Sequence, residues 1–338
     1  MTSKRQIAFI YLIVTSLLIT YITWDICALP WDLSCYSPDG SYADRLMHQG
    51  GFLAYLQENN LIPPSTNSLT YPFYSSLVYS DSIPLFGIIS KLFLYKKVFG
   101  FQFFGLASLI FTFLNGYFAF EFCKRLKISF IGSLVTSTFI QLAPISIIRG
   151  LDHEALSAQF LLIGIMQLST YSSLRIKSTI YWSALLFISL GIHAYFAYFL
   201  IFFQYSKLSL DLIINYLILR KEKNQKRNPN IIKFSFKVIS INIFSTLIIT
   251  LICFFLFGYG FGTVDPGNIA WNASIHGFWD PKPTLNYLFD FHNVKLNYPF
   301  SFSFPRTPFQ HEGFAYIGFP LITWSIFLFL ISRKQFPF

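Results

Sequence analysis

Charged residues are scarce in this chain: they make up 12% of its 338 residues, whereas 54% are hydrophobic. A typical soluble domain has about 25% charged residues. The shortage of charge therefore excludes an ordinary soluble protein and predicts a chain that crosses a membrane several times. The net charge of +10 is compatible with nucleic-acid binding. However, the basic residues cluster between apolar runs instead of alternating with aromatic residues, so we expect no nucleic-acid partner.

Cysteine is also rare, with four residues in the whole chain. Cys123 lies beside a basic cluster and Cys253 lies inside an apolar run, which leaves Cys27 and Cys35 together in the first polar loop. These two could form a disulfide if the loop faces an oxidising compartment. The chain has no cysteine or histidine spacing typical of a metal site, no glycine-rich phosphate loop and no internal repeat.

Long apolar runs are abundant. The first, 6–24, follows Lys4 and Arg5 and is long enough to cross a bilayer. It could be a signal peptide, but it exceeds the usual apolar core of one and no small-residue cleavage site follows, so we interpret it as a retained anchor. Further spans are expected at about 101–122, 128–148, 154–171, 178–192, 194–219, 235–259 and 314–332. The segment 83–97 is short and contains proline and three lysines, which favours an interfacial or re-entrant helix.

The distribution of charge predicts the topology. With a cytoplasmic N-terminus and eight spans, every cytoplasmic loop is basic, as the positive-inside rule requires, and the C-terminus is cytoplasmic too. Twelve of the fifteen acidic residues then face outward: Asp25, Asp32, Asp39, Asp44, Glu58, Asp81, Asp152, Glu154, Asp265, Asp280, Asp290 and Glu312. We therefore expect an all-α membrane bundle of about eight helices in one domain, 1–338. Two long outer loops, 25–100 and 260–313, would carry interfacial helices and any chemistry.

The first outer loop contains two candidate catalytic acids. Asp44 and His48 are four residues apart, so they share one face of the helix expected over 44–57. The alternative is that Asp44 only caps this helix, which Gly50 and Gly51 would weaken. Asp81 precedes Ser-Ile-Pro in a sequence typical of a helix N-cap, and capping is the simplest role for it.

The segment 148–160, "IRGLDHEALSAQF", places Arg149, Asp152 and His153 near the outer end of two spans. Capping explains Asp152 and also Glu154, because acids are favoured at helix N-termini. Capping does not explain Arg149, a cation on the outer side. An anionic ligand such as a phosphate would explain it.

Two further places offer polar side chains on the outer side. The last outer loop contains a dense cluster just before the final span: Arg306, Gln310, His311 and Glu312. His193 lies at the outer turn between two spans, where it could be a structural histidine or a ligand contact.

Several stretches resemble a family of bacterial inner-membrane proteins of unassigned function, which is itself similar to the GT-C superfamily of glycosyltransferases. The stretches follow the family's order along nearly the whole chain: "DRLMHQGGF" (44–52), "SLVYSDSIPLFGIISKLF" (76–93), "FQFFGLASLIFTFLNGYFAF" (101–120), "GLDHEALSAQFLL" (150–162), "GIHAYF" (191–196) and "QHEGFAYIGF" (310–319). The chain departs from the family at Phe52, where tryptophan is usual. It also stops at Phe338, where family members usually continue, so we expect a C-terminal extension to be lacking.

The resemblance implies a GT-C-like bundle and an inverting transfer of a sugar. The donor would be a polyprenyl-phosphate sugar, and the acceptor an envelope glycan, lipid or protein on the outer side of the inner membrane. Carried onto this chain, the resemblance makes Asp44 the catalytic base and Asp81 the second acid, with Asp39 as a weaker substitute. The substrate-binding residues would be His48, Arg149, Asp152, His153, His193, Arg306, Gln310, His311 and Glu312, with Lys282 as a further phosphate contact.

The chemistry of this transfer agrees with the charges read from the residues, because it needs a carboxylate base and cations for the departing phosphate. A nucleotide-sugar donor is disfavoured, since it would require a cytoplasmic site. No cofactor is implied, although paired acids could hold Mg²⁺ or Mn²⁺. Three alternatives stay open: a lipid-linked sugar transporter or flippase, a non-catalytic envelope-assembly subunit, and an acyltransferase that would use His193.

Overall fold

The computed structural model describes residues 3–24, 43–70, 73–80, 82–94, 102–143, 146–147, 154–170, 176–221 and 229–259. Within these ranges the chain is mostly helical. The predicted last span, the outer loop 260–313 and the Cys27–Cys35 pair lie outside the described residues.

Four helices are long and apolar enough to cross a membrane: α1 (Ser3–Trp24), α4 (Phe104–Arg125), α9 (Ala194–Lys221) and α10 (Pro229–Leu256). A helix rises about 1.5 Å per residue, so the 22 residues of α4 reach about 33 Å, which matches the hydrocarbon core of a bilayer. Length and composition are therefore consistent with the expected multi-pass membrane protein.

Shorter apolar helices occupy the other predicted spans within the described residues: α5 (Phe130–Gln141), η3 (Glu154–Ser157), α7 (Phe160–Ser169) and α8 (Ile176–Ile192). Eight crossings were expected, but α5, with 12 residues, and α7, with 10, are too short to span alone. The predicted interfacial segment forms α3 (Pro84–Leu94), which at 11 residues is likewise too short to cross.

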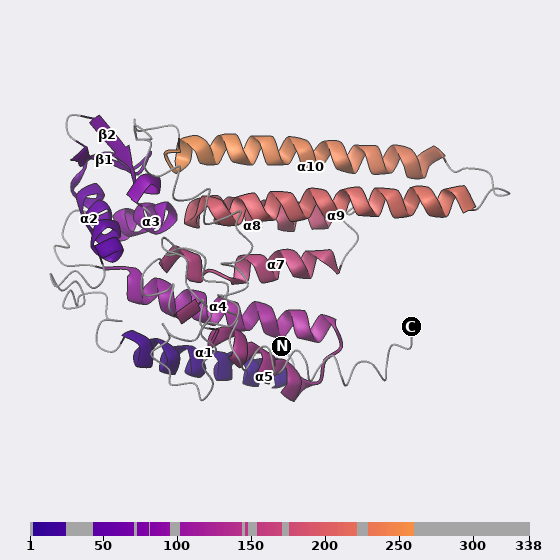
Figure 1. Cartoon of the computed structure of the whole chain (residues 1–338), viewed down its shortest axis with the longest axis horizontal. Helices are drawn as coiled ribbons and strands as arrows, with labels where there is room; N and C mark the ends of the chain where they lie inside the picture. The colour runs from indigo at the N-terminus through magenta and orange to yellow at the C-terminus, as the bar shows by residue number, and fades with distance from the viewer. Residues whose placement is uncertain are drawn as a thin grey trace, which may run out of the picture.

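The long helices lie side by side, α5, α7 and α8 lie along them, and α2 (Ala43–Gln57), α3 and the two strands gather at one end of the bundle (Figure 1). The helix α4 packs against α1, α5 and α7, while α8 packs against α9, α10 and α3. At the end that carries Lys124 and Arg125, Arg5 Nη2 lies 3.1 Å from Glu121 Oε2, so α1 and α4 run antiparallel. We call this the basic end. The opposite end, which holds α2, α3 and the two strands, is the hairpin end.

The hairpin corrects the all-α expectation. Strands β1 (Ser65–Thr70) and β2 (Phe73–Ser76) pair antiparallel, with Ser65 opposite Ser76 and Thr70 opposite Phe73. Ser76 Oγ donates a hydrogen bond to the Phe257 carbonyl oxygen over 3.2 Å, which fastens the hairpin to the end of α10. Gly258 has φ +83° there, a conformation that favours glycine just past a helix C-terminus.

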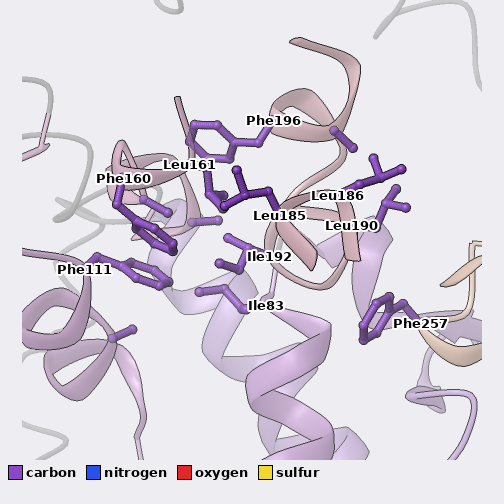
Figure 2. Packing of buried hydrophobic residues seen from close by; sticks show 14 of the residues in the cluster. Ile83, Phe111, Phe160, Leu161, Leu185, Leu186, Leu190, Ile192, Phe196 and Phe257 are labelled. Atoms are coloured by element: carbon purple, nitrogen blue, oxygen red, sulfur yellow. The ribbon is translucent and has the colours of Figure 1, made fainter. Parts of the chain in front are cut away.

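The core lies between α4, α7 and α8 and is rich in aromatic residues. Phe111 of α4 and Phe160 of α7 have ring centroids 5.9 Å apart, and both are buried (Figure 2). At the hairpin end, Phe52 of α2 packs on Phe103 with centroids 4.5 Å apart. This packing attaches α2 to the start of α4. The aromatic core therefore extends directly beneath the helix that carries Asp44.

Candidate functional site

The helix α2 confirms the one predicted over 44–57, so Asp44 and His48 lie one turn apart on it. Asp44 is in the first helical turn, and its side chain is outside the described residues. The helix continues through Gly50 and Gly51 instead of breaking there. Gly51 is required by packing: a Cβ at this position would fall 2.9 Å from Ser80 Cβ. The absence of a side chain therefore lets α2 approach the segment that flanks Asp81.

The serines on both sides of Asp81 are buried against α2. Ser82 Oγ donates a 2.6 Å hydrogen bond to the His48 carbonyl oxygen, and Ser80 Oγ lies 3.1 Å from Ser82 Oγ. Asp81 itself lies outside the described residues. The sequence predicted Asp81 as the N-cap of α3, but the N-cap is Ile83. The Ile83 carbonyl oxygen accepts the first hydrogen bond of the helix, from the Gly87 amide.

The most unusual contact of the site joins His48 to Glu154. His48 Nδ1 lies 3.1 Å from Glu154 Oε2, and the two side chains are 0% and 1% exposed. Moving an ionisable pair out of water is costly, so such pairs persist where geometry or function holds them. Glu154 Oε1 has no hydrogen-bond partner among the described residues. The sequence interpretation of Glu154 as a helix-capping acid is therefore incomplete, since its carboxylate points to another element.

A fully buried asparagine of α4 fixes the backbone around Glu154. Asn115 Nδ2 donates to the Ser157 carbonyl oxygen over 2.9 Å, and Asn115 Oδ1 accepts from the Phe160 amide over 2.6 Å. Ser157 Oγ in turn donates to the Glu154 carbonyl oxygen over 2.7 Å. These bonds satisfy polar groups at the junction of η3 and α7, and they tie that junction to the middle of α4.

The other end of α2 is held by a lysine. Lys91 Nζ of α3 donates to the carbonyl oxygens of Tyr55, over 2.7 Å, and of Asn60, over 2.6 Å. It also lies 3.9 Å from the centre of the Tyr55 ring. A cation at a helix C-terminus satisfies orphan carbonyls and the helix dipole. Burial raises the pKa of Tyr55, whose hydroxyl donates to Leu61 O over 2.7 Å. Lys91 therefore stabilises the orientation of α2.

His193, which the sequence left open as a structural histidine or a ligand contact, caps the start of α9. It lies between α8 and α9, where its Nδ1 accepts a hydrogen bond from the Tyr195 amide over 3.2 Å. Its ring also packs edge-on against the Tyr195 ring, with centroids 4.6 Å apart. These contacts belong to the first turn of α9, so the described geometry favours helix capping.

The remaining predicted site residues lie outside the described residues: Arg149, Asp152, His153, Arg306, Gln310, His311 and Glu312, with Asp39 and Lys282. The expected meeting of the acids with arginines therefore stays a prediction. Within the described part of the chain, no three His, Cys, Asp or Glu side chains come together to hold a metal ion. The geometry there is that of a buried imidazole–carboxylate pair beside the helix that carries Asp44.

A comparison with known proteins identifies a family. Residues 8–337 match the family described as a domain of unknown function (DUF6311), and the chain belongs to it. No curated protein and no solved structure matches the chain.

Proposed function

We propose that this DUF6311 member is a GT-C-like membrane glycosyltransferase. It moves a sugar from a polyprenyl-phosphate donor to an envelope glycan, lipid or protein on the outer side of the bacterial inner membrane. The hairpin end of the bundle is the outer end, and the site lies there, around α2.

The buried contact between His48 and Glu154 carries this proposal. These residues are 106 positions apart in sequence and belong to two of the acid-containing stretches that resemble the glycosyltransferase family, 44–52 and 150–162. A buried ionisable pair adds little to the stability of a scaffold, whereas an enzyme that transfers protons can use one in its site. His48 lies on the same helix as Asp44, the acid to which the resemblance gives the role of base.

The proposed reaction is a single displacement at the anomeric carbon. An acceptor hydroxyl oxygen attacks that carbon, its proton passes to the Asp44 carboxylate, and the bond from the sugar to the lipid phosphate breaks. The polyprenyl phosphate departs with the electron pair of the broken bond. Arg149 and Arg306, with Lys282, stabilise the negative charge on that phosphate, and Asp81 supports the acceptor. Inversion at the anomeric carbon follows from the single step.

The experiment uses full-length protein in membrane vesicles, supplied in turn with radiolabelled polyprenyl-phosphate mannose, glucose or galactose. We expect label to enter the envelope acceptor fraction with the wild type. Asp44→Asn should lower this transfer at least about a hundredfold, because a positioned base contributes roughly 10²–10⁴ in rate.

Asp211→Asn is the matched control. Asp211 pairs with Lys207 on α9, so the substitution removes the same charge without touching α2. Its transfer rate should equal that of the wild type. Full activity of Asp44→Asn would remove Asp44 from the role of base. Movement of intact labelled donor across the vesicle membrane, with no bond broken, would show a flippase instead.

A further inference from the structure

We infer that Glu154 is a positioning residue of this site: through His48, it fixes the orientation and the charge of an imidazole one helical turn from Asp44. This inference rests on the proposed sugar transfer, because Asp44 has a role only there. Neither the sequence pattern nor the family match assigns Glu154 such a role.

Glu154 is buried, and its carboxylate therefore needs a partner. Its side chain is 1% exposed, and within the described residues its carboxylate has one polar contact, with His48 Nδ1. A carboxylate with one partner in an apolar interior is stable only if that partner offsets its charge. The His48 ring is placed to do this, because a protonated imidazole can donate from Nδ1 to the Glu154 carboxylate.

Within the described residues, the other charged groups on the elements that pack against α2 contact other partners. The helix α2 packs against β1, η2 (Leu77–Ser80) and α3, and it is followed by Glu58. Lys91 of α3 is directed to the carbonyl oxygens at the other end of α2. Glu58 Oε1 accepts from Thr66 Oγ1 and the Asn67 amide. Tyr55 is neutral, because burial raises its pKa. On α2 itself, Asp44 and Arg45 are charged, and their side chains lie outside the described residues.

Hydrogen bonds to the backbone hold both Glu154 and His48 in place. Asn115, which is fully buried, bonds to both sides of the η3–α7 junction, and Ser157 closes the turn on Glu154. On the other side, Ser82 Oγ holds the His48 backbone. The carboxylate and the imidazole are thus each fixed by their own element, so their contact sets how α2 lies against α4.

The consequence for the reaction follows from helix geometry. Side chains at positions i and i+4 have Cβ atoms about 6 Å apart. A cationic imidazole one helical turn away in sequence favours the ionised form of Asp44 and so keeps the base ready to accept a proton. Without the negative charge of Glu154, a buried His48 loses its proton at lower pH, and Asp44 loses this support.

The test compares Glu154→Gln with Glu121→Gln. Glutamine keeps an oxygen that accepts a hydrogen bond from His48 Nδ1, but it removes the charge. Glu121 is the matched control, because it also forms a 3.1 Å ion pair, with Arg5, but at the basic end. Glu154→Asp restores the charge with a shorter reach. All variants are tested in the full chain in nanodiscs labelled with ¹⁵N-histidine, and His48→Gln assigns the His48 signal among the six histidines.

Two quantities are measured for each variant: the pH at which His48 is half protonated, by NMR, and the pH dependence of sugar transfer. We expect Glu154→Gln to lower the His48 midpoint by about one pH unit or more, as loss of an adjacent opposite charge does. It should also lower kcat at least about tenfold with little change in KM for the donor. Glu154→Asp should recover part of both, and Glu121→Gln should change neither.

The outcomes separate this inference from the proposed function. If wild-type protein transfers sugar and Glu154→Gln leaves the rate, its pH profile and the His48 midpoint unchanged, the positioning role is overturned and the transferase survives. If the His48 midpoint moves but no donor is used by any variant, the pairing stands and sugar transfer fails. Should Glu154→Gln not fold, Glu154→Asp decides: an unchanged midpoint and rate would overturn the inference.

Discussion

Gly51 is the residue at which α2 comes closest to its neighbours, and it provides a prediction about stability. In Gly51→Ala the new methyl group would lie 2.9 Å from Ser80 Cβ and 3.3 Å from Ser82 Oγ. Overpacking of this kind costs about 1–3 kcal/mol. We expect a lower midpoint of thermal unfolding in detergent, measured by tryptophan fluorescence.

Gly50 is the matched control, because it lies in the same helix and a Cβ there would meet nothing within 4 Å. Gly50→Ala should leave the midpoint unchanged or raise it, since alanine favours a helix over glycine by about 1 kcal/mol. A Gly51→Ala protein as stable as Gly50→Ala would contradict the tight packing of α2 on Ser80.

The residues of the site show what a single sequence can reveal. The spacing of Asp44 and His48 predicted their shared helix because both positions belong to one local element. The partner of His48 could not be found in this way, since Glu154 is 106 positions away and looks like a capping acid. The sequence did give one indication of Glu154: it lies in the stretch 150–162, which resembles the glycosyltransferase family, next to the predicted site residues Asp152 and His153.

At the scale of helices, one buried amide links three of them. Asn242 of α10 accepts from Gln204 Nε2 of α9 over 3.1 Å and donates to Thr179 Oγ1 of α8 over 2.9 Å. Hydrogen bonds between membrane helices contribute on average about 0.6 kcal/mol each. We expect Asn242→Leu to lower the free energy of unfolding by about 1–2 kcal/mol, measured by unfolding in mixed micelles.

Ser245→Ala serves as the control for Asn242→Leu. Among the described residues its hydroxyl donates to Asn242 O, within α10 itself, so its loss should change the free energy of unfolding little. Equal effects of the two substitutions would show that Asn242 does not join the helices.

The positions of the helices were predictable, whereas their lengths and the hairpin were not. An apolar run predicts a helix whichever neighbour it packs against, so the helices could be placed from the sequence. Their ends depend on single residues: α5 ends at Gln141, before the predicted 148, because Pro144 cannot continue a helix. The hairpin segment 65–76 is rich in serine and threonine and looks like a loop. Its strands are fixed by a contact with Phe257, which no local pattern reveals.

At the scale of the whole molecule, the two ends of the bundle differ in charge and structure, and the proposed topology places the hairpin end outside. In a cysteine-free background, Tyr74→Cys, at a site that is 51% exposed, should react with a membrane-impermeant maleimide in intact spheroplasts. Lys127→Cys, beyond the basic end of α4, should react only after lysis. The reverse pattern would put the site in the cytoplasm and exclude an outer donor.

The bond between Ser76 and Phe257 joins residues 181 positions apart, and it has a consequence for biosynthesis. A ribosome releases the first of these residues long before the second. The hairpin must therefore wait, without its anchor, while the seven α-helices described between these two residues, from α3 to α10, are made. The hairpin end of the bundle is therefore begun early in synthesis and completed only after α10 has been made.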